Sequence, residues 1–126
     1  MQVLIDSSVW IDYFRGGTKS DDVDILIDEN LIATNDLILT ELIPYLRLQN
    51  RRKLIDLMNS IFKYELHIDW NEIVDYQTKC LKKGINGIGV PDLLIAQNSI
   101  QNHCEIFSLD QHFALMKNPL KLKLFK

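Results

Sequence analysis

Four carboxylates in the sequence stand beside apolar stretches, where an unpaired charge is costly: Asp6, Glu41, Asp92 and Asp110. Asp6 ends the apolar run Val3-Leu4-Ile5, and Asp110 ends the run Ile106-Phe107-Ser108-Leu109. If the four carboxylates converge, they repel one another and raise one another's pKa values. Hard divalent cations such as Mg²⁺ and Mn²⁺ relieve this repulsion, because they prefer oxygen ligands. The residue types therefore point to an acidic cavity that holds such a cation.

The runs before Asp6 and Asp110 indicate how two of these carboxylates would meet. Val3, Leu4 and Ile5 do not alternate with polar residues, which is typical of a strand buried on both faces. A helical pattern follows each run, so both carboxylates fall at the carboxyl ends of strands in a parallel sheet. Ligands bind at that edge of an open α/β sheet. We therefore expect Asp6 and Asp110 on the same edge.

Each carboxylate other than Asp6 also has a purely structural explanation. Asp92 follows Pro91 at the start of a helical pattern, where a negative charge favours the helix dipole. Asp110 fits a turn or a helix cap, and Glu41 fits a solvated position on a helix. The spacing of these residues leaves both explanations open. Asp6 is the hardest to explain without a ligand, because it ends a buried strand.

Strand and helix patterns alternate along the chain and predict a single α/β domain over residues 1–126, with a mainly parallel central sheet flanked by helices. Apolar residues at helical spacing predict helices over the following ranges: 36–48, 51–62, 70–83 and from Pro91 onward. Leu120, Leu122 and Leu124 alternate with lysines, which predicts a last, half-exposed strand.

Composition and charge narrow the class of protein. Hydrophobic residues make up 47% of the chain and the net charge is −3, which argues against binding nucleic acid by bulk positive charge. An acidic site that carries its own cation is still compatible with this charge. Cys80 and Cys104 lie far apart, as expected for reduced cysteines, and no apolar run reaches the roughly 20 residues that span a bilayer. We expect a cytoplasmic protein with no membrane partner.

Four motifs run through the chain from end to end: Asp6-Ser7-Ser8-Val9-Trp10-Ile11-Asp12-Tyr13-Phe14-Arg15-Gly16, Leu39-Thr40-Glu41-Leu42, Val90-Pro91-Asp92-Leu93-Leu94-Ile95-Ala96 and Phe107-Ser108-Leu109-Asp110-Gln111-His112-Phe113. Together they resemble the motifs of PIN-domain proteins, and most closely those of the VapC toxins of bacterial and archaeal toxin–antitoxin pairs. Each motif alone is weak, but the set and its order are specific.

The resemblance implies an acidic site that binds Mg²⁺ or Mn²⁺ and cleaves RNA, thereby inhibiting translation. The family's catalytic and metal-binding carboxylates fall on four residues here: Asp6, Glu41, Asp92 and Asp110. Asp6 is the expected principal metal ligand, with Asp92 and Glu41 completing its shell, and Asp110 holds a second metal or orients the attacking water. Ser8 matches the hydroxyl that supports the site. Ser108 keeps a hydroxyl where Thr is frequent.

Phosphate contacts must come from local basic residues, because the overall charge is negative. Arg15 is near Asp6 in sequence, and Arg47, Arg51 and Arg52 belong to the densest basic cluster. A solvated helix face explains that cluster equally well. The histidines are scattered and are expected at the surface or in packing rather than as general bases: His67, His103 and His112.

The resemblance also implies partners. A VapC-type protein forms a homodimer and binds a small cognate antitoxin, whose tail inserts near the acidic site and blocks it. Residues of apolar or aromatic type that could serve an interface are Trp10, Tyr13, Phe14, Tyr45 and Leu46. Trp10 and Phe14 are better explained as core residues.

Two other functions fit the same residues. One is a housekeeping PIN nuclease that processes RNA, and the other is a PIN-fold binding module without catalytic activity. A small antitoxin-like reading frame directly upstream would favour the toxin over the housekeeping nuclease. Loss of metal-dependent cleavage on substitution of Asp6 would separate a nuclease from a binding module.

Overall fold

The centre of the fold is a parallel sheet of three short strands, described for all of residues 1–126 by a computed structural model. The strands are β1 (Val3–Ile5), β2 (Ile32–Ala33) and β3 (Glu105–Phe107), in the order β2-β1-β3. β1 is the middle strand and pairs in parallel with both neighbours, Leu4 lying opposite Ala33 and Ile106. The predicted parallel α/β fold is confirmed.

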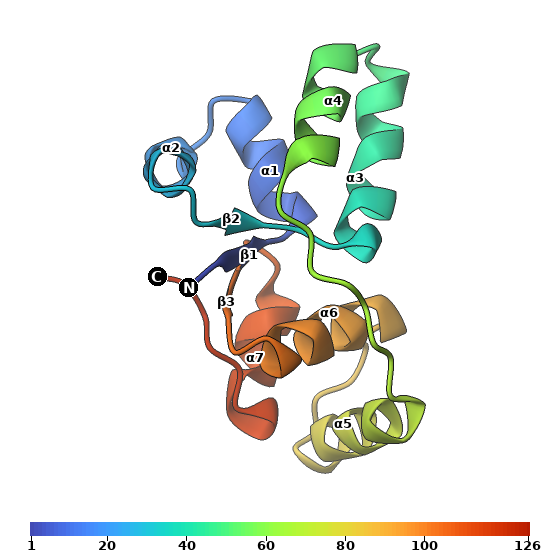
Figure 1. The fold of residues 1–126 in the computed structure, drawn as a ribbon. Coiled ribbons are helices and arrows are strands. Elements are labelled where there is room, and N and C mark those ends of the chain that lie inside the picture. The colour runs from blue at the N-terminus through green and yellow to red at the C-terminus, as the bar shows by residue number, and fades with distance from the viewer.

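Seven helices cover the two faces of this sheet: α1 (Ser7–Phe14), α2 (Ser20–Asp28), α3 (Asp36–Leu48), α4 (Arg52–Ser60), α5 (Trp70–Lys82), α6 (Val90–Gln101) and α7 (Gln111–Leu120). Helices α1 to α4 lie on one face, and α5 to α7 lie on the other (Figure 1). The two ends of the chain lie close together at one side of the sheet (Figure 1). None of the helices is long and apolar enough to cross a bilayer.

The side chains of β1 explain why its sequence does not alternate. Leu4 belongs to a core cluster of 17 buried residues under α5, α6 and α7. Val3 and Ile5 belong to a second cluster of 11 buried residues under the other helices. Successive side chains of a strand point to opposite faces, so a strand with a core on each side needs apolar residues throughout.

A buried pair of amides joins the start of α3 to α6. The side chain of Asn35 caps α3 by accepting a hydrogen bond from the Ile38 N–H at 2.9 Å. Its amide nitrogen donates to Oδ1 of Asn98 at 2.9 Å, and the Asn98 amide donates to the carbonyl of Glu65 at 3.1 Å. This bridge fixes α3, which carries Glu41, against the opposite layer.

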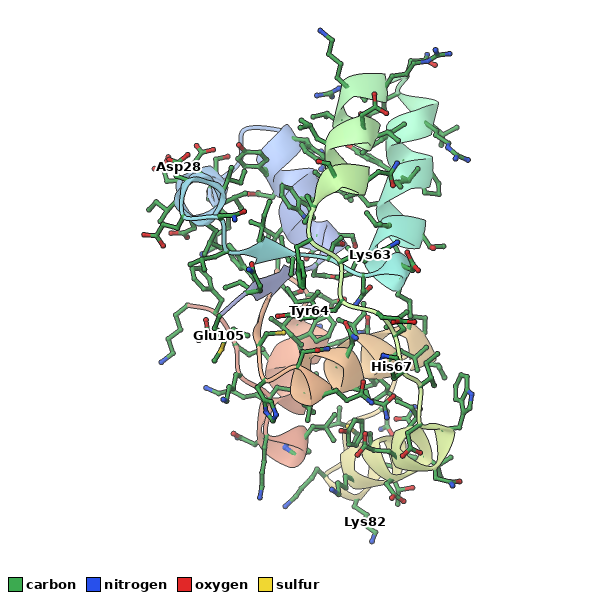
Figure 2. The ribbon with its side chains drawn as sticks, viewed as in Figure 1. Asp28, Lys63, Tyr64, His67, Lys82 and Glu105 are labelled. Atoms are coloured by element: carbon green, nitrogen blue, oxygen red, sulfur yellow. The ribbon has the colours of Figure 1, made fainter.

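The connector from α4 to α5 crosses from one layer to the other. Lys63 lies where the connector passes the sheet, and His67 lies further along it, near α6 (Figure 2). At its end, Gln97 of α6 donates hydrogen bonds to the Asp69 carbonyl at 3.1 Å and to Oε1 of Glu72 at 2.7 Å. Gln97 thus holds the first turn of α5 in place.

The predicted last strand is wrong in its extent. Helix α7 continues to Leu120, and Lys121 follows in the left-handed conformation with φ 58°. Leu120 and Leu122 are buried because they pack into the larger core cluster. Leu124 alone forms a bridge, in parallel with Ile106. Alternation of leucine and lysine at this end therefore reflects a helix end and a packed tail.

Candidate metal site at the sheet edge

Asp6 is a buried carboxylate held by two serine hydroxyls. It follows β1, its residue exposure is 5%, and its backbone N–H donates to the Phe107 carbonyl at 2.9 Å. Ser8 Oγ and Ser108 Oγ each donate to Oδ2 of Asp6 at 2.8 Å. Hydrogen bonds of this kind offset the cost of burying a negative charge. Ser8, which is on α1, and Ser108, which follows β3, therefore support Asp6 together.

Asp110 and Asp92 are joined to this network through Ser108 and His112. The Asp110 N–H donates to Ser108 Oγ at 2.9 Å. Oδ1 of Asp110 accepts from the His112 N–H at 2.9 Å, so Asp110 also caps α7. Nδ1 of His112 lies 2.9 Å from Oδ2 of Asp92, in the first turn of α6. Asp110 thus caps a helix, and Asp92 lies in the first turn of a helix, where its charge favours the dipole. Both residues also belong to the same cluster of carboxylates.

Glu41 lies on α3 at the exposed side of the cluster. Its pKa is raised, first by loss of hydration and then by repulsion from three other carboxylates: Asp6, Asp92 and Asp110. The pKa of Asp92 is also raised, chiefly by burial; the hydrogen bond from His112 opposes this shift, while repulsion from Asp110 and Asp6 adds to it. The four carboxylates therefore act on one another electrostatically across the sheet edge.

The donor set of this cluster fits a hard divalent cation. No protein hydrogen bond engages Oδ1 of Asp6, Oδ1 of Asp92 or Oδ2 of Asp110, so each aspartate has one fixed and one free oxygen. Ligand atoms of Asp92, Asp110 and His112 lie within 4.8 Å of one another. Free carboxylate oxygens are the donors that Mg²⁺ and Mn²⁺ prefer, and a cation would offset both the loss of hydration and the repulsion that raise the pKa values of Glu41 and Asp92.

Arg15 lies away from the carboxylates, although it is close to Asp6 in sequence. It is the C-cap of α1 and follows Ser8 by seven residues, or about 10 Å along the helix axis. It lies beside Tyr45, whose pKa is lowered by hydrogen bonds with Gln49 and Arg15 and by the charges of Arg15 and Arg51. Arg15 and Arg51 therefore both act electrostatically on Tyr45 rather than on the carboxylates.

The remaining basic candidates also lie outside the cluster. Arg47, in the last turn of α3, lines a hollow between α3 and α4 together with Asp36 and Lys63, which form an ion pair at 2.9 Å. Arg52 is the first residue of α4 and is exposed. The α3–α4 turn, which carries these basic residues, lies away from the sheet (Figure 1). None of these arginines forms an ion pair with a carboxylate of the candidate site.

His112 is the site residue that the sequence prediction placed wrongly. It was expected at the surface or in packing, but its ring contacts Asp92. His67 and His103 are exposed, as expected. Ser108 was predicted only to keep a hydroxyl, and its bond to Asp6 was not predicted. The signal for His112 was its position two residues after Asp110, in the first turn of the helix that Asp110 caps.

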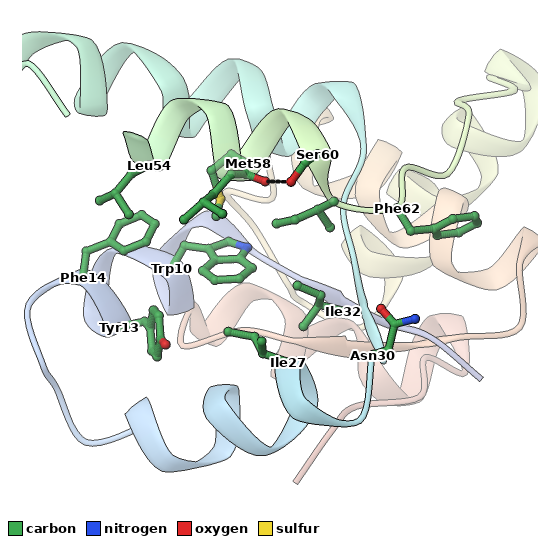
Figure 3. A pocket seen from close by; sticks show the side chains of 12 residues that line it. Trp10, Tyr13, Phe14, Ile27, Asn30, Ile32, Leu54, Met58, Ser60 and Phe62 are labelled. Atoms are coloured by element: carbon green, nitrogen blue, oxygen red, sulfur yellow. Dashed lines mark hydrogen bonds between the residues drawn. The ribbon is translucent and has the colours of Figure 1, made fainter. Parts of the chain in front are cut away.

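An apolar groove of about 340 Å³ lies between α1, α2 and α4 (Figure 3). Trp10, Tyr13 and Phe14 contribute from α1, facing Leu54 and Met58 of α4 (Figure 3). The other lining residues are Ile27, Asn30, Ile32, Leu57, Ser60, Ile61 and Phe62. The Ser60 hydroxyl is already used, because it donates to the Leu57 carbonyl at 2.7 Å. The groove is therefore mainly apolar, since 10 of its 12 lining residues are hydrophobic.

Most of the predicted interface residues divide between this groove and the core; Tyr45 is half-buried and belongs to neither. Trp10 is 1% exposed and is a core residue whose ring also forms the floor of the groove. Phe14, expected in the core, is half-buried and stacks on Trp10 with ring centroids 5.9 Å apart. Leu46 is fully buried, so it does not serve an interface. The Tyr13 hydroxyl donates to Oδ1 of Asp24 at 2.6 Å.

The model of the PIN-domain family matches residues 3–118 of the chain. The chain therefore belongs to the PIN-domain family, and the resemblance that four sequence motifs indicated is confirmed. No curated protein matches the chain by sequence.

Solved structures similar to the chain include three complexes. VapBC2 from Rickettsia felis, bound to a DNA fragment from its promoter, matches with a TM-score of 0.77 and 20% identity over 99% of this chain and 98% of that one. FitAcB from Neisseria gonorrhoeae matches with a TM-score of 0.76 and 16% identity over 99% and 97%. DNA-bound VapBC from Salmonella typhimurium matches with a TM-score of 0.73 and 12% identity over 99% and 97%. At these identities the likeness describes the fold.

Proposed function

We propose that the protein is a metal-dependent endoribonuclease of the VapC type, the toxin of a toxin–antitoxin pair, and that it inhibits translation by cutting RNA. The observation that carries this proposal is the set of carboxylates at one sheet edge, each aspartate with one oxygen fixed by the protein and one left free. Membership of the PIN-domain family supports a nuclease, and the VapBC fold supports the toxin class.

The proposed roles follow from how each carboxylate is held. Asp6 is the principal ligand of Mg²⁺ or Mn²⁺, because Ser8 and Ser108 fix its orientation. Asp92 and Glu41 complete the set of ligands, and Asp110 holds a second cation or orients the attacking water. A bound divalent cation supplies charge neutralisation at the phosphoryl group and a water of lowered pKa.

The basic residues are proposed to bind RNA beside the scissile bond rather than at it. The charges of Arg15 and Arg51 both act on Tyr45, and Arg15 lies at the far end of α1 from the carboxylates. Arg47 and Arg52 lie on or beside the same α3–α4 turn. Their distance from the carboxylates suits phosphates a few nucleotides away, where positive charge adds affinity without sequence preference.

The apolar groove is proposed to bind the cognate antitoxin. The structural neighbours are complexes named VapBC and FitAcB, which supports a protein partner. Helix α2, on one side of the groove, is rich in acidic residues: Asp21, Asp22, Asp24 and Asp28. An amphipathic segment of the antitoxin that carries basic residues toward α2 would match both the hydrocarbon and the charge. A homodimer of the toxin is part of the same proposal.

The test is sequencing of RNA 5′ ends after induced expression of the wild type and of Asp6→Asn. We expect discrete cuts that the wild type makes and Asp6→Asn does not. Asp75→Asn is the matched control, because Asp75 is exposed on α5 and belongs neither to the carboxylate cluster nor to the groove. It should cut as the wild type does.

Purified protein provides the second arm of this test. Cleavage of RNA should require added Mg²⁺ or Mn²⁺ and stop with a chelator. A folded wild type that cuts no RNA with either metal, across transfer, ribosomal and messenger RNA, would refute the nuclease and favour a binding module.

A further inference from the structure

His112 is the residue through which two of the carboxylates are oriented. It lies in the first turn of α7, and its backbone N–H is bonded to Asp110 while its ring is bonded to Asp92. Asp92 belongs to α6 and Asp110 precedes α7, so a single residue ties two separate elements. No other protein group donates a hydrogen bond to either carboxylate.

The contact with Asp92 fixes the tautomer of the ring. A carboxylate accepts hydrogen bonds and does not donate them, so the proton of a 2.9 Å contact must be on Nδ1 of His112. A ring nitrogen that donates this proton has no lone pair left for a metal. Nδ1 lies further, 3.6 Å, from Oδ1 of Asp110, which the backbone N–H already engages. The ring therefore serves Asp92.

We propose that His112 is a positioning residue of the site: its ring N–H holds Oδ2 of Asp92, so that Oδ1 of Asp92 is available to a divalent cation. The role parallels that of Ser8 and Ser108, which hold one oxygen of Asp6. Groups that orient a metal-binding side chain through a hydrogen bond typically change metal affinity roughly 10–100-fold when removed. The inference rests on the proposed function only in assuming that the site binds a cation.

Substitutions at His112 separate the hydrogen bond from the shape of the ring. In His112→Asn the amide nitrogen takes the place of Nδ1 and keeps a donor, whereas His112→Leu fills a similar space without one. The measurement is the dissociation constant of Mn²⁺, from the electron spin resonance signal of free Mn²⁺ with no RNA present. We expect a roughly 10–100-fold weaker affinity for His112→Leu and nearly the wild-type value for His112→Asn.

Two controls keep the test decisive. His67→Leu, at an exposed histidine on the connector, should bind Mn²⁺ as the wild type does. In metal-free wild-type protein, at a pH where the ring is neutral, long-range ¹H–¹⁵N correlation should place the His112 proton on Nδ1. This second measurement needs no variant, so it decides the hydrogen bond even if His112→Leu fails to fold.

The outcomes also separate this inference from the proposed function. A proton on Nε2, an unchanged Mn²⁺ affinity in His112→Leu, or a nitrogen coupling from His112 on bound Mn²⁺ would overturn the positioning role, and the last would make His112 a ligand. If the wild type cuts RNA but His112→Leu binds Mn²⁺ normally, the positioning role of His112 is refuted and the proposed function stands. If the Mn²⁺ affinity depends on His112 but the protein cuts no RNA, the proposed function is refuted and the positioning role stands.

Discussion

The acidic cluster and the apolar groove are two regions of opposite chemistry that share helix α1. Ser8, in the first turn of α1, donates to the buried Asp6, while Trp10, Tyr13 and Phe14 line the groove further along the helix. The cluster is built from charges and hydrogen bonds, and the groove is built from side chains that pack. One short helix therefore serves two sites.

The two regions should differ in what they contribute to the molecule. Loss of hydration and the repulsion between like charges oppose folding, as the raised pKa values of Glu41 and Asp92 indicate. Buried aromatic and aliphatic groups favour folding in proportion to the area removed from water. Substitutions in the cluster should thus affect activity at little cost in stability, and substitutions under the groove should do the reverse.

The largest expected effect is on catalysis, through Asp6→Asn. The amide keeps the shape and can still accept from Ser8 and Ser108, but it is neutral and binds a divalent cation poorly. RNA cleavage should fall by roughly 1,000-fold, while the melting temperature of metal-free protein stays the same or rises. Initial cleavage rates and thermal melts in chelator measure the two quantities. A large fall in stability would show that Asp6 is mainly structural.

The next effect tests the opposite region, through Trp10→Ala. Trp10 is fully buried and packs against both Tyr13 and Phe14, so the free energy of unfolding should fall by about 3–5 kcal/mol. Denaturant unfolding measures this change.

Trp70→Ala is the control, because Trp70 is 59% exposed on α5, outside the groove. It should change the free energy of unfolding by less than about 0.5 kcal/mol. Equal costs at Trp10 and Trp70 would contradict the assignment of Trp10 to the core.

A smaller effect separates the outer surface of the groove from its floor. Leu57 lines the groove and is 56% exposed, so Leu57→Arg should leave folding and RNA cleavage intact. It should weaken binding of the cognate antitoxin by at least about 30-fold, because it places a charge in an apolar contact. Titration calorimetry with purified antitoxin measures the affinity. Leu48→Arg, at an exposed leucine outside the groove, should bind normally, and equal losses in both variants would refute this binding site.

The smallest effect concerns the repulsion within the cluster. The pKa of Glu41 is raised in the folded protein, so the folded state binds a proton more readily than the unfolded chain does. Ionising Glu41 therefore removes stability as the pH rises from the ordinary pKa through the raised one. Glu41→Gln should remove this loss and gain about 1–2 °C over metal-free wild type at pH 7, with no gain near pH 4.

Thermal melts in chelator at several pH values measure the difference between variant and wild type. Glu29→Gln, at an exposed residue after α2, is the control and should follow the wild type at each pH. A gain of Glu41→Gln that is largest at low pH would have the wrong sign and would refute the raised pKa of Glu41.

Much of the fold could be predicted because local rules and tertiary packing agree. Helix α3 spans the predicted residues 36–48, and Asn35 caps it as its residue type suggests. The uninterrupted apolar run at residues 3–5 predicted a strand buried on both faces, which the two core clusters explain. The prediction of a strand from Leu120 to Leu124 was wrong because apolar residues at every second position also fit a helix end followed by a packed tail.

The positions of candidate-site residues at strand ends could be predicted from the sequence. Contacts between side chains of different helices could not. Asp6 and Asp110 follow adjacent parallel strands, so their proximity follows from topology. The contact of His112 with Asp92 depends on how α7 lies against α6, which no local pattern in the sequence specifies. Closeness in sequence to Asp6 does not place Arg15 beside the carboxylates, since a helix carries residues away along its axis.

The serine bonds to Asp6 have a consequence for when the acidic cluster can form during synthesis. Ser108 is 102 residues from Asp6, and the Leu109 N–H that donates to Ser8 Oγ is 101 residues from it. A growing chain at the ribosome lacks these partners until residues 108 and 109 have been made. Chains emerge at about 5–20 residues per second, so the unfinished polypeptide spends several seconds without a complete acidic site. The acidic site on which the proposed RNA cleavage depends can therefore form only after residues 108 and 109 have been added to the chain.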